Sequence, residues 1–310
     1  MLYSREIYGD ILVELGGERK EIVVLDCDLS GSTRTKKFAL AFPDRFFNMG
    51  VSEQDMVGTA VGLALSGKVP FASTFAIFET GRAWEQIRQS VCYPRLNVKL
   101  VASHGGITVG PDGASHQSLE DIAIMRVLPN MTIIVPADGV ETGLVVKAVS
   151  EYEGPVYVRL NRNKTPVIYD ENHSFKLGKS DILREGKDAA IIAAGIMVYY
   201  SLEASKQLAS EGIEASVINM STIKPIDKEI IIKSAMESKA IVTVEEHSVI
   251  GGLGGAVAEV LCENYPVPLK RIGINDKFGM SGKAEELLKL YGLSVEDIAA
   301  GVKEVIKKKR

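Results

Sequence analysis

Residues 98–117 read VKLVASHGGITVGPDGASHQ, an apolar run followed by a glycine-rich loop. The run Val98–Ser103 has the length of a buried strand. The loop after it holds four glycines, a proline and two of the chain's four histidines, His104 and His116. Ligands of open α/β sheets bind at the carboxyl ends of the strands. The stretch therefore predicts a parallel α/β fold with a ligand-binding loop at the edge of the sheet.

Apolar runs of strand length alternate with helical patterns on both sides of this stretch, which is typical of parallel sheets covered by helices on both faces. The strands expected in the first half of the chain are Glu21–Asp26, Phe46–Met49, Val69–Ser73, Val98–Ser103, Thr132–Pro136 and Val156–Asn161. Ser52 and Asp138 are predicted to cap the helices that follow them.

A second α/β unit is predicted after a polar, turn-rich stretch. Its expected strands and helices are Ala189–Ala194, Val198–Ser210, Ala215–Asn219, Asp227–Lys239, Ala240–Glu245, Leu253–Asn264 and Lys270–Ile274. Ser294 and Asp297 form a capping-box pattern before a last helix. We therefore expect two doubly wound, three-layer α/β/α domains with parallel sheets, at residues 1–165 and 188–310, joined by a linker at 166–187.

Composition excludes several classes of protein. The 310 residues include 36 Lys and Arg against 40 Asp and Glu, a net charge of −4 without a basic face, which argues against nucleic-acid binding. The longest nearly apolar stretch, Ala189–Tyr200, has 12 residues, fewer than the ~20 that a membrane span needs. Three widely spaced cysteines indicate neither disulfides nor a zinc site, and the start of the chain is unlike a signal peptide. We expect a cytoplasmic protein.

Three segments carry side chains suited to chemistry. His104, Asp112 and His116 are able to bind hydroxyl or phosphate groups or to transfer protons, although a purely structural loop is the alternative. Glu53 lies in the first turn of a predicted helix, either as a catalyst or as an acid that compensates the helix dipole. Phe75 and Phe78 either pack in the core or line the pocket of an aromatic ligand.

A glycine cluster at residues 251–255 raises the possibility of a dinucleotide site. The spacing fails the G-x-G-x-x-G pattern, because a frame that starts at Gly252 requires a glycine at Val257. We expect tight packing of a helix against a strand instead.

Taken together, the segments 50–54, 74–78, 104–117 and 128–138 occur in the order and spacing seen in transketolases. The sequence resembles the C-terminal half of a transketolase made as a separate chain, with a pyrimidine-binding domain followed by a transketolase C-terminal domain. The resemblance implies thiamine diphosphate as the cofactor. It also implies that Glu53 hydrogen-bonds a ring nitrogen of the aminopyrimidine, that Phe78 stacks on this ring and that Phe75 lines the same pocket. Gly81 stands where many transketolases have a third aromatic residue.

The resemblance assigns the substrate contacts as well. Asp112 and His116 match residues that bind the hydroxyl groups of the donor sugar, and we expect His116 to act in catalysis together with Glu53. His104 and Arg162 match residues that contact the sugar phosphate. Arg34 is a further expected phosphate contact.

One feature of the family is missing. Such enzymes hold the diphosphate through Mg²⁺ bound by a Gly-Asp-Gly motif, and this sequence has no such motif. The Mg²⁺ ion and the diphosphate are therefore expected to be held by a partner chain that resembles the N-terminal half. Two copies of this chain and two partners would form a heterotetramer, inactive without the partner, that transfers a two-carbon ketol unit from a ketose phosphate to an aldose.

Three rival functions remain open. The β-subunit of a 2-oxo acid dehydrogenase has a similar domain plan, but the loop from His104 to His116 fits a phosphorylated polyol better. The matching half of 1-deoxyxylulose-5-phosphate synthase usually has arginine at the position of His104. A non-catalytic relative would be expected to have lost some of the matched polar residues, because buried acids and histidines without a ligand are costly.

Overall fold

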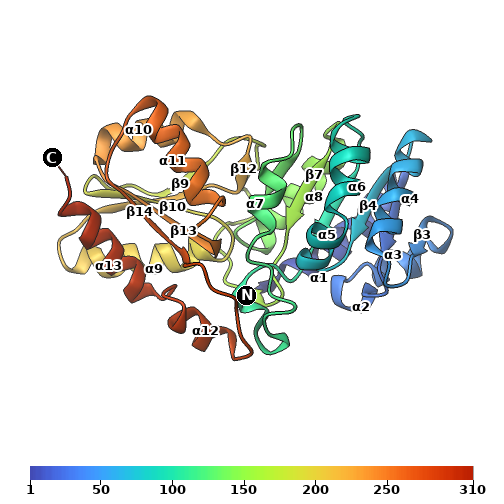
Figure 1. Cartoon of the computed structure of the whole chain (residues 1–310), viewed down its shortest axis with the longest axis horizontal. Helices are drawn as coiled ribbons and strands as arrows, with labels where there is room; N and C mark the ends of the chain where they lie inside the picture. The colour runs from blue at the N-terminus through green and yellow to red at the C-terminus, as the bar shows by residue number, and fades with distance from the viewer. Residues whose placement is uncertain (310) are drawn as a thin grey trace.

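Two sheets form the core of the computed structural model, which describes residues 1–309. They belong to two α/β units that lie side by side, each with helices on both faces of its sheet (Figure 1). The predicted fold class is confirmed. None of the helices within residues 1–309 has the length and hydrophobicity of a membrane span.

The first sheet has seven strands in the order β12-β6-β7-β5-β4-β2-β3. Their bounds are β2 Ile22–Asp26, β3 Phe46–Asn48, β4 Val69–Ser73, β5 Lys99–Ala102, β6 Thr132–Ile134, β7 Val156–Arg159 and β12 Thr222–Lys224. All neighbours are parallel except β12, which pairs antiparallel with β6 at the edge. A separate antiparallel pair joins β1 (Leu2–Tyr3) to β8 (Lys164–Thr165).

Helices cover both faces of the first sheet. Those of this unit are α1 Ser4–Glu18, α2 Ser30–Thr33, α3 Lys36–Ala41, α4 Glu53–Leu65, α5 Ala76–Arg82, α6 Trp84–Gln86, α7 Asp121–Arg126 and α8 Gly139–Glu151. Shorter turns are the 3₁₀ segments η1 Pro43–Arg45 and η3 Ile107–Asp112 and the π-helical turn η2 Ile87–Cys92. Buried residues of α1 and α8 share one apolar cluster with the sheet, whereas α4 and α5 contribute to the cluster on the other face.

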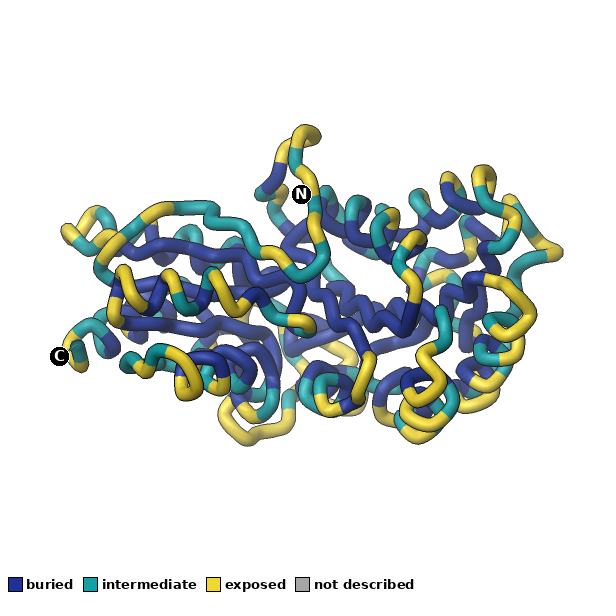
Figure 2. The backbone as a smooth tube through the Cα atoms, turned by 90° about the horizontal axis from the view of Figure 1, so that it is seen from above, coloured by how far each residue is buried: buried dark blue, intermediate teal, exposed yellow. Residues whose placement is uncertain are grey.

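The second sheet has five strands in the order β14-β13-β10-β11-β9. Its strands and helices are β9 Asp181–Arg184, β10 Ala189–Ala193, α9 Met197–Ser210, β11 Ala215–Asn219, α10 Lys228–Ser238, β13 Ile241–Ser248, α11 Leu253–Asn264, β14 Leu269–Ile274, α12 Ala284–Leu290 and α13 Val295–Ile306. Helices α9 and α13 lie on one face, and α10 and α11 on the other (Figure 1). The strands of both sheets are largely buried, while the outer turns of the helices are exposed (Figure 2).

Besides the pair β1 and β8, two short strands were not expected from the sequence. β9 lies within the stretch predicted as a linker and pairs antiparallel with β11. β12 lies after that stretch, yet it extends the first sheet. With four and three residues, both are too short to show a periodicity, and both form only because a sheet edge is available to them.

The predicted helix caps hold at two of three positions. The side chain of Asp138 accepts a hydrogen bond from Glu141 N at 2.8 Å, and Ser294 forms a reciprocal capping box with Asp297. The prediction that Ser52 caps α4 is wrong, because its side chain makes no capping hydrogen bond. The backbone ψ of 73° at Ser52 differs from the extended values at Ser294 and Asp138, but Asp227 caps α10 at a similar ψ of 87°, so ψ alone does not explain the missing bond.

The glycine cluster packs α11 tightly against β13, as expected. A Cβ at Gly252 would overlap a carboxylate oxygen of Glu245. That carboxylate accepts hydrogen bonds from Leu253 N at 2.7 Å and Gly254 N at 2.8 Å. An acid of the protein itself therefore occupies the start of this helix, where a phosphate would otherwise bind.

Candidate active site

The predicted site residues gather at the carboxyl ends of the strands of the first sheet. Glu53 comes shortly after β3, and Phe75 comes two residues after β4. His104 follows β5, and Arg162 follows β7. Because β7, β5, β4, β2 and β3 are consecutive neighbours, these side chains project from one edge of the sheet.

Glu53 is the first residue of α4 and is only 4% exposed. The helix N-terminus favours a negative charge at this position. Arg82 Nη1 donates to Glu53 Oε1 at 2.9 Å, and the Arg82 guanidinium lies 4.3 Å from the centre of the Phe78 ring. Arg82, which sequence analysis missed, therefore connects the buried acid to the aromatic part of the site.

Four aromatic side chains form a continuous cluster beside this acid. The Phe75 ring stacks on His104 at 3.7 Å between centroids and on Phe78 at 5.9 Å. The His116 ring packs edge-on against Phe78 at 5.3 Å and against Phe75 at 6.2 Å. The two predicted aromatic residues and the two predicted histidines thus lie together, although up to 41 residues separate them in the chain.

His104 is held in a strained, buried position. Its backbone has φ of 63°, and its side chain Nδ1 lies 2.8 Å from Ser103 Oγ. Burial lowers the pKa of His104 to about 3, and the neighbouring charges of Arg5 and Arg162 act in the same direction. A neutral imidazole can contact a ligand through a hydrogen bond without carrying charge.

We expect His104 to stay neutral in the unliganded chain throughout the range from pH 8 to pH 5, because a pKa of about 3 lies below that range. The measurement is proton NMR of the histidine ring resonances against pH, with His104 assigned by its loss in His104→Asn. A titration midpoint near the ordinary histidine value of about 6.5 would contradict the expectation.

Asp112 and Arg162 lie together at the rim of the loop. Arg162 Nη1 is 3.5 Å from Asp112 Oδ1, and the same nitrogen donates to Val109 O. Each of the two charged side chains is 30% exposed. Their charged ends are therefore accessible to a ligand.

A group of arginines makes this side of the loop positive. Arg5, in the first turn of α1, is a second member of this group. Burial lowers the pKa of Arg5, and the nearby charges of Arg34 and Arg162 lower it further. Arg5 Nη1 donates to Ser32 O at 2.9 Å. Arg34 instead pairs with Glu6 at 2.7 Å, so its charge is largely compensated within the chain. Arg5 was missed from the sequence, since an arginine near the start of a helix has no distinguishing pattern.

The second unit supports the loop that carries the two histidines. Thr108 N donates to Glu246 Oε1, and Glu246 is buried at the end of the second sheet. Gly106 has φ of 89°, and a Cβ at this position would overlap the Glu246 carboxyl group. Glycine is therefore required here by both backbone conformation and space.

Two further side chains connect the loop to the rest of the molecule. Gln117 Nε2 donates to Met280 O at 2.9 Å, across the boundary between the units. Arg159 Nη2 donates to Ser118 O at 3.1 Å and to Glu246 O at 2.9 Å. The position of the loop thus depends on the second unit. The sequence alone did not predict this role of the second unit.

A cavity of about 1110 Å³ lies between the two units and is separate from this site. Its walls include Tyr199, Tyr200 and Lys289, and Thr108 is the residue of the 104–117 loop among them. The aromatic cluster of Phe75, Phe78 and the two histidines does not line it.

Residues 1–167 match the family model for the transketolase pyrimidine-binding domain, and residues 178–298 match that for the transketolase C-terminal domain. A Methanocaldococcus jannaschii protein, named provisionally as a transketolase C-terminal section, is 56% identical over 98% of this chain and 96% of its own length.

Two relatives have more specific names. The 6-deoxy-6-sulfo-D-fructose transketolase subunit SqwH of a Clostridium species is 44% identical over 99% of this chain and 95% of its own length. A subunit of the apulose-4-phosphate transketolase of Phocaeicola vulgatus is 42% identical over 99% of each chain. A solved structure described as a split-gene transketolase in an inactive beta4 tetramer superimposes with a TM-score of 0.94 at 53% identity over the full length of both chains. The chain therefore belongs to the transketolase family.

Proposed function

We propose that this chain is the C-terminal subunit of a thiamine diphosphate-dependent transketolase, which transfers a two-carbon ketol unit from a ketose phosphate to an aldose or aldose phosphate. The observation that carries the proposal is the arrangement at the edge of the first sheet. There the buried acid Glu53 and the rings of Phe75 and Phe78 adjoin His104 and His116. The family, which is thiamine diphosphate-dependent, gives this arrangement its chemical context.

The residues present fit one part of the cofactor. A buried carboxyl group beside aromatic rings suits an aminopyrimidine, which needs a hydrogen-bond partner for its ring nitrogen and a stacking surface. In this proposal Glu53 holds the proton at that nitrogen, and Phe78 and Phe75 line the ring. When bound, the cofactor supplies a nucleophilic carbon that receives and releases the two-carbon unit.

The Gly-Asp-Gly motif through which the family binds the diphosphate is absent from the sequence. A magnesium ion in such a site is bound by carboxylate and other oxygen ligands. Within residues 1–309, the group of three metal-ligating side chains that the structure brings together lies elsewhere, at the junction of the two units. We therefore propose that Mg²⁺ and the diphosphate are held by the N-terminal-half partner chain.

The substrate contacts follow the positions of the polar side chains. In the proposal, Asp112 and His116 bind hydroxyl groups of the donor sugar, and His116 moves protons to and from them. Arg162 and His104 contact the phosphate, where a guanidinium is able to donate two parallel hydrogen bonds. We add Arg5 to this group because its charge acts on both His104 and Arg162. Arg34 remains a predicted contact that would first have to leave Glu6.

The relatives support an anionic substrate without fixing its identity. The names of the two relatives with stated substrates specify a sulfonated sugar in one case and a phosphorylated sugar in the other. Both carry an anionic group, which the arginines near His104 would bind. We propose a ketose phosphate as the donor of this chain.

The assembly proposed is a heterotetramer built on a homodimer of this chain, with two N-terminal-half partners. Val51, two residues before Glu53, is 74% exposed. An exposed apolar side chain beside the candidate site is compatible with a surface that another chain covers. The solved relative in a beta4 tetramer is described as inactive, which agrees with a need for the partner. We also propose a cytoplasmic location, since Cys27, Cys92 and Cys262 are all unpaired.

The decisive experiment measures ketol transfer from xylulose 5-phosphate to ribose 5-phosphate, with Mg²⁺ and thiamine diphosphate, for this chain alone and after addition of the N-terminal-half partner. Activity that depends on the mixture supports the proposal. Activity of the chain alone contradicts the division of the cofactor site. A mixture that uses pyruvate as donor in preference to ketose phosphates favours the synthase or dehydrogenase alternatives.

A further inference from the structure

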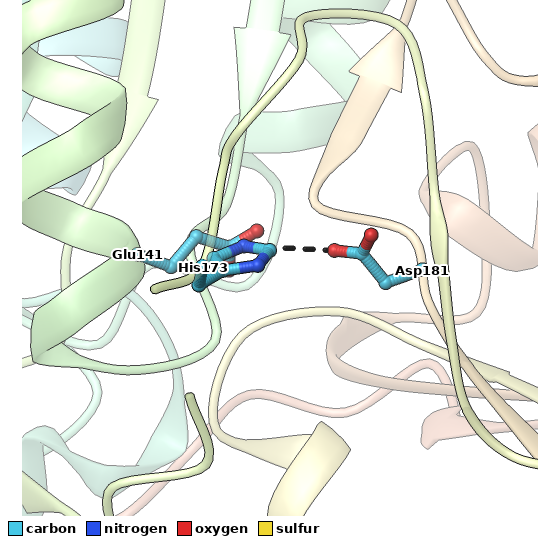
Figure 3. A group of neighbouring side chains, drawn as sticks. All are labelled: Glu141, His173 and Asp181. Atoms are coloured by element: carbon cyan, nitrogen blue, oxygen red, sulfur yellow. Dashed lines mark ion pairs between the residues drawn. The ribbon is translucent and has the colours of Figure 1, made fainter. Parts of the chain in front are cut away.

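Three potential metal ligands meet at the junction of the two units (Figure 3). Glu141 lies in the first turn of α8, His173 lies in the segment between the units, and Asp181 is the first residue of β9. Their ligand atoms all lie within 4.8 Å of one another, and His173 Nε2 is 3.6 Å from Asp181 Oδ2. None of these residues belongs to the candidate active site.

Two buried atoms at this junction lack partners within the described chain. The His173 side chain is only 10% exposed, and its buried Nε2 atom has no hydrogen-bond partner. Asn219 Oδ1, at the end of β11, is buried without a partner as well. Among residues 1–309, neither Glu141 nor Asp181 forms an ion pair with a lysine or arginine. The cluster therefore combines available lone pairs with two carboxyl groups that no lysine or arginine neutralises, of which Glu141 has its pKa raised to about 7 by burial.

Neighbouring side chains hold the three ligands in place. The Tyr169 ring stacks on His173 at 3.6 Å, and its hydroxyl group donates to Asp181 Oδ2 at 2.8 Å. Asn219 Nδ2 donates to Glu141 Oε1 and Oε2 at 3.0 and 3.1 Å. Hydrogen bonds of this kind orient ligands in metal sites.

We propose that Glu141, His173 and Asp181 bind one divalent transition-metal ion, represented by Zn²⁺. An imidazole with carboxylates suits zinc, whereas Mg²⁺ and Ca²⁺ prefer oxygen ligands alone. Atoms bound to zinc at about 2.0–2.1 Å in a tetrahedron lie about 3.3 Å apart. The distance of 3.6 Å between His173 Nε2 and Asp181 Oδ2 is close to this value, whereas the Glu141 carboxylate is placed only within 4.8 Å of the other two and would have to approach them on binding.

The position of the site gives the ion a structural role. Glu141 belongs to the first unit, while β9, which starts at Asp181, pairs with β11 in the second sheet. A metal ion would join the segment between the units to both of them. Asp181 is 44% exposed, which leaves a path for the ion and a position for a water ligand.

The test is a zinc titration of the full chain by isothermal calorimetry after treatment with a chelator, in parallel with His173→Ala and Asp181→Asn. We expect the wild-type chain to bind one zinc ion more than either variant. Tyr169→Phe, which keeps the ring and loses the hydroxyl contact to Asp181, is expected to bind this ion about 10- to 100-fold more weakly. Glu171→Gln is the matched control, since it removes an exposed acid from the same segment outside the cluster.

Equal zinc stoichiometry and affinity in the wild type and the two ligand variants would overturn the proposal. Zinc bound elsewhere, for example at the exposed Cys262, adds the same stoichiometry to the wild type and to every variant, so it does not affect the difference between them. If His173→Ala fails to fold, Co²⁺ bound to the wild type and to Asp181→Asn gives a second readout. Visible absorption bands that only the wild type shows support the site, and identical spectra refute it. None of these results depends on ketol transfer.

Discussion

Replacing Glu53 with Gln is expected to lower the turnover of ketol transfer by about 10²- to 10⁴-fold, the usual contribution of a positioned acid or base. Glutamine keeps the shape of the side chain but has no carboxylate that could share a proton with the ring nitrogen of the cofactor. The glutamine side chain fills the same buried space at the start of α4, so the fold is expected to persist. The measurement is kcat of the complex with the partner chain.

Two comparisons separate this effect from damage to the fold. The partner of Glu53 in the chain, Arg82, is half exposed, so loss of their ion pair is expected to change the free energy of unfolding by no more than about 1 kcal/mol. Asp55→Asn removes an exposed acid from the same first turn and is expected to leave kcat unchanged. Full activity of Glu53→Gln would refute the assignment, as would an equal loss in Asp55→Asn.

The second large effect concerns Arg162. Replacement with Ala is expected to lower kcat/KM for phosphorylated donors by about 10- to 100-fold, because a hydrogen bond to a charged group contributes about 1.5–3 kcal/mol. Unphosphorylated ketoses lack this contact, so their kcat/KM is expected to fall much less. The ratio of the two values is the quantity to measure.

Lys164→Ala is the control for Arg162→Ala, since it removes a positive charge two residues further along the chain. It is expected to change both kinds of substrate alike. An Arg162→Ala variant that loses activity equally toward phosphorylated and unphosphorylated donors would place this arginine outside the phosphate site. That outcome would leave Arg5, His104 and Arg34 as the remaining proposed contacts.

Much of the architecture could be predicted from short stretches of sequence. The runs that form β2, β4, β10 and β11 are apolar over the length of a strand because these strands are covered on both faces. The caps at Asp138 and Ser294 depend on residues three positions away, so they too are visible locally. The cap expected at Ser52 failed because a cap also requires the side chain to be turned toward the first backbone N–H groups of the helix, which the residue type does not specify.

The residues of the candidate site were likewise predicted only in part from the sequence. Glu53, Phe75, Phe78, His104 and His116 were identified from motifs, and the structure brings them to one edge of the first sheet. Arg82, Arg5 and Glu246 escaped notice since each acts on a residue at least 29 positions away. Such pairs have no sequence spacing that repeats between proteins, so only the folded chain reveals them.

By itself, the sequence determined the α/β architecture, the family and the identities of the residues at the edge of the first sheet. Those features follow from hydrophobic periodicity and from residue types at short spacing, which are local properties. The tertiary structure alone decided that the second unit supports the loop 104–117, that the charge of Arg5 acts on His104, and that Glu141, His173 and Asp181 meet. These contacts arise from the packing of two sheets against each other, and packing depends on the whole chain at once.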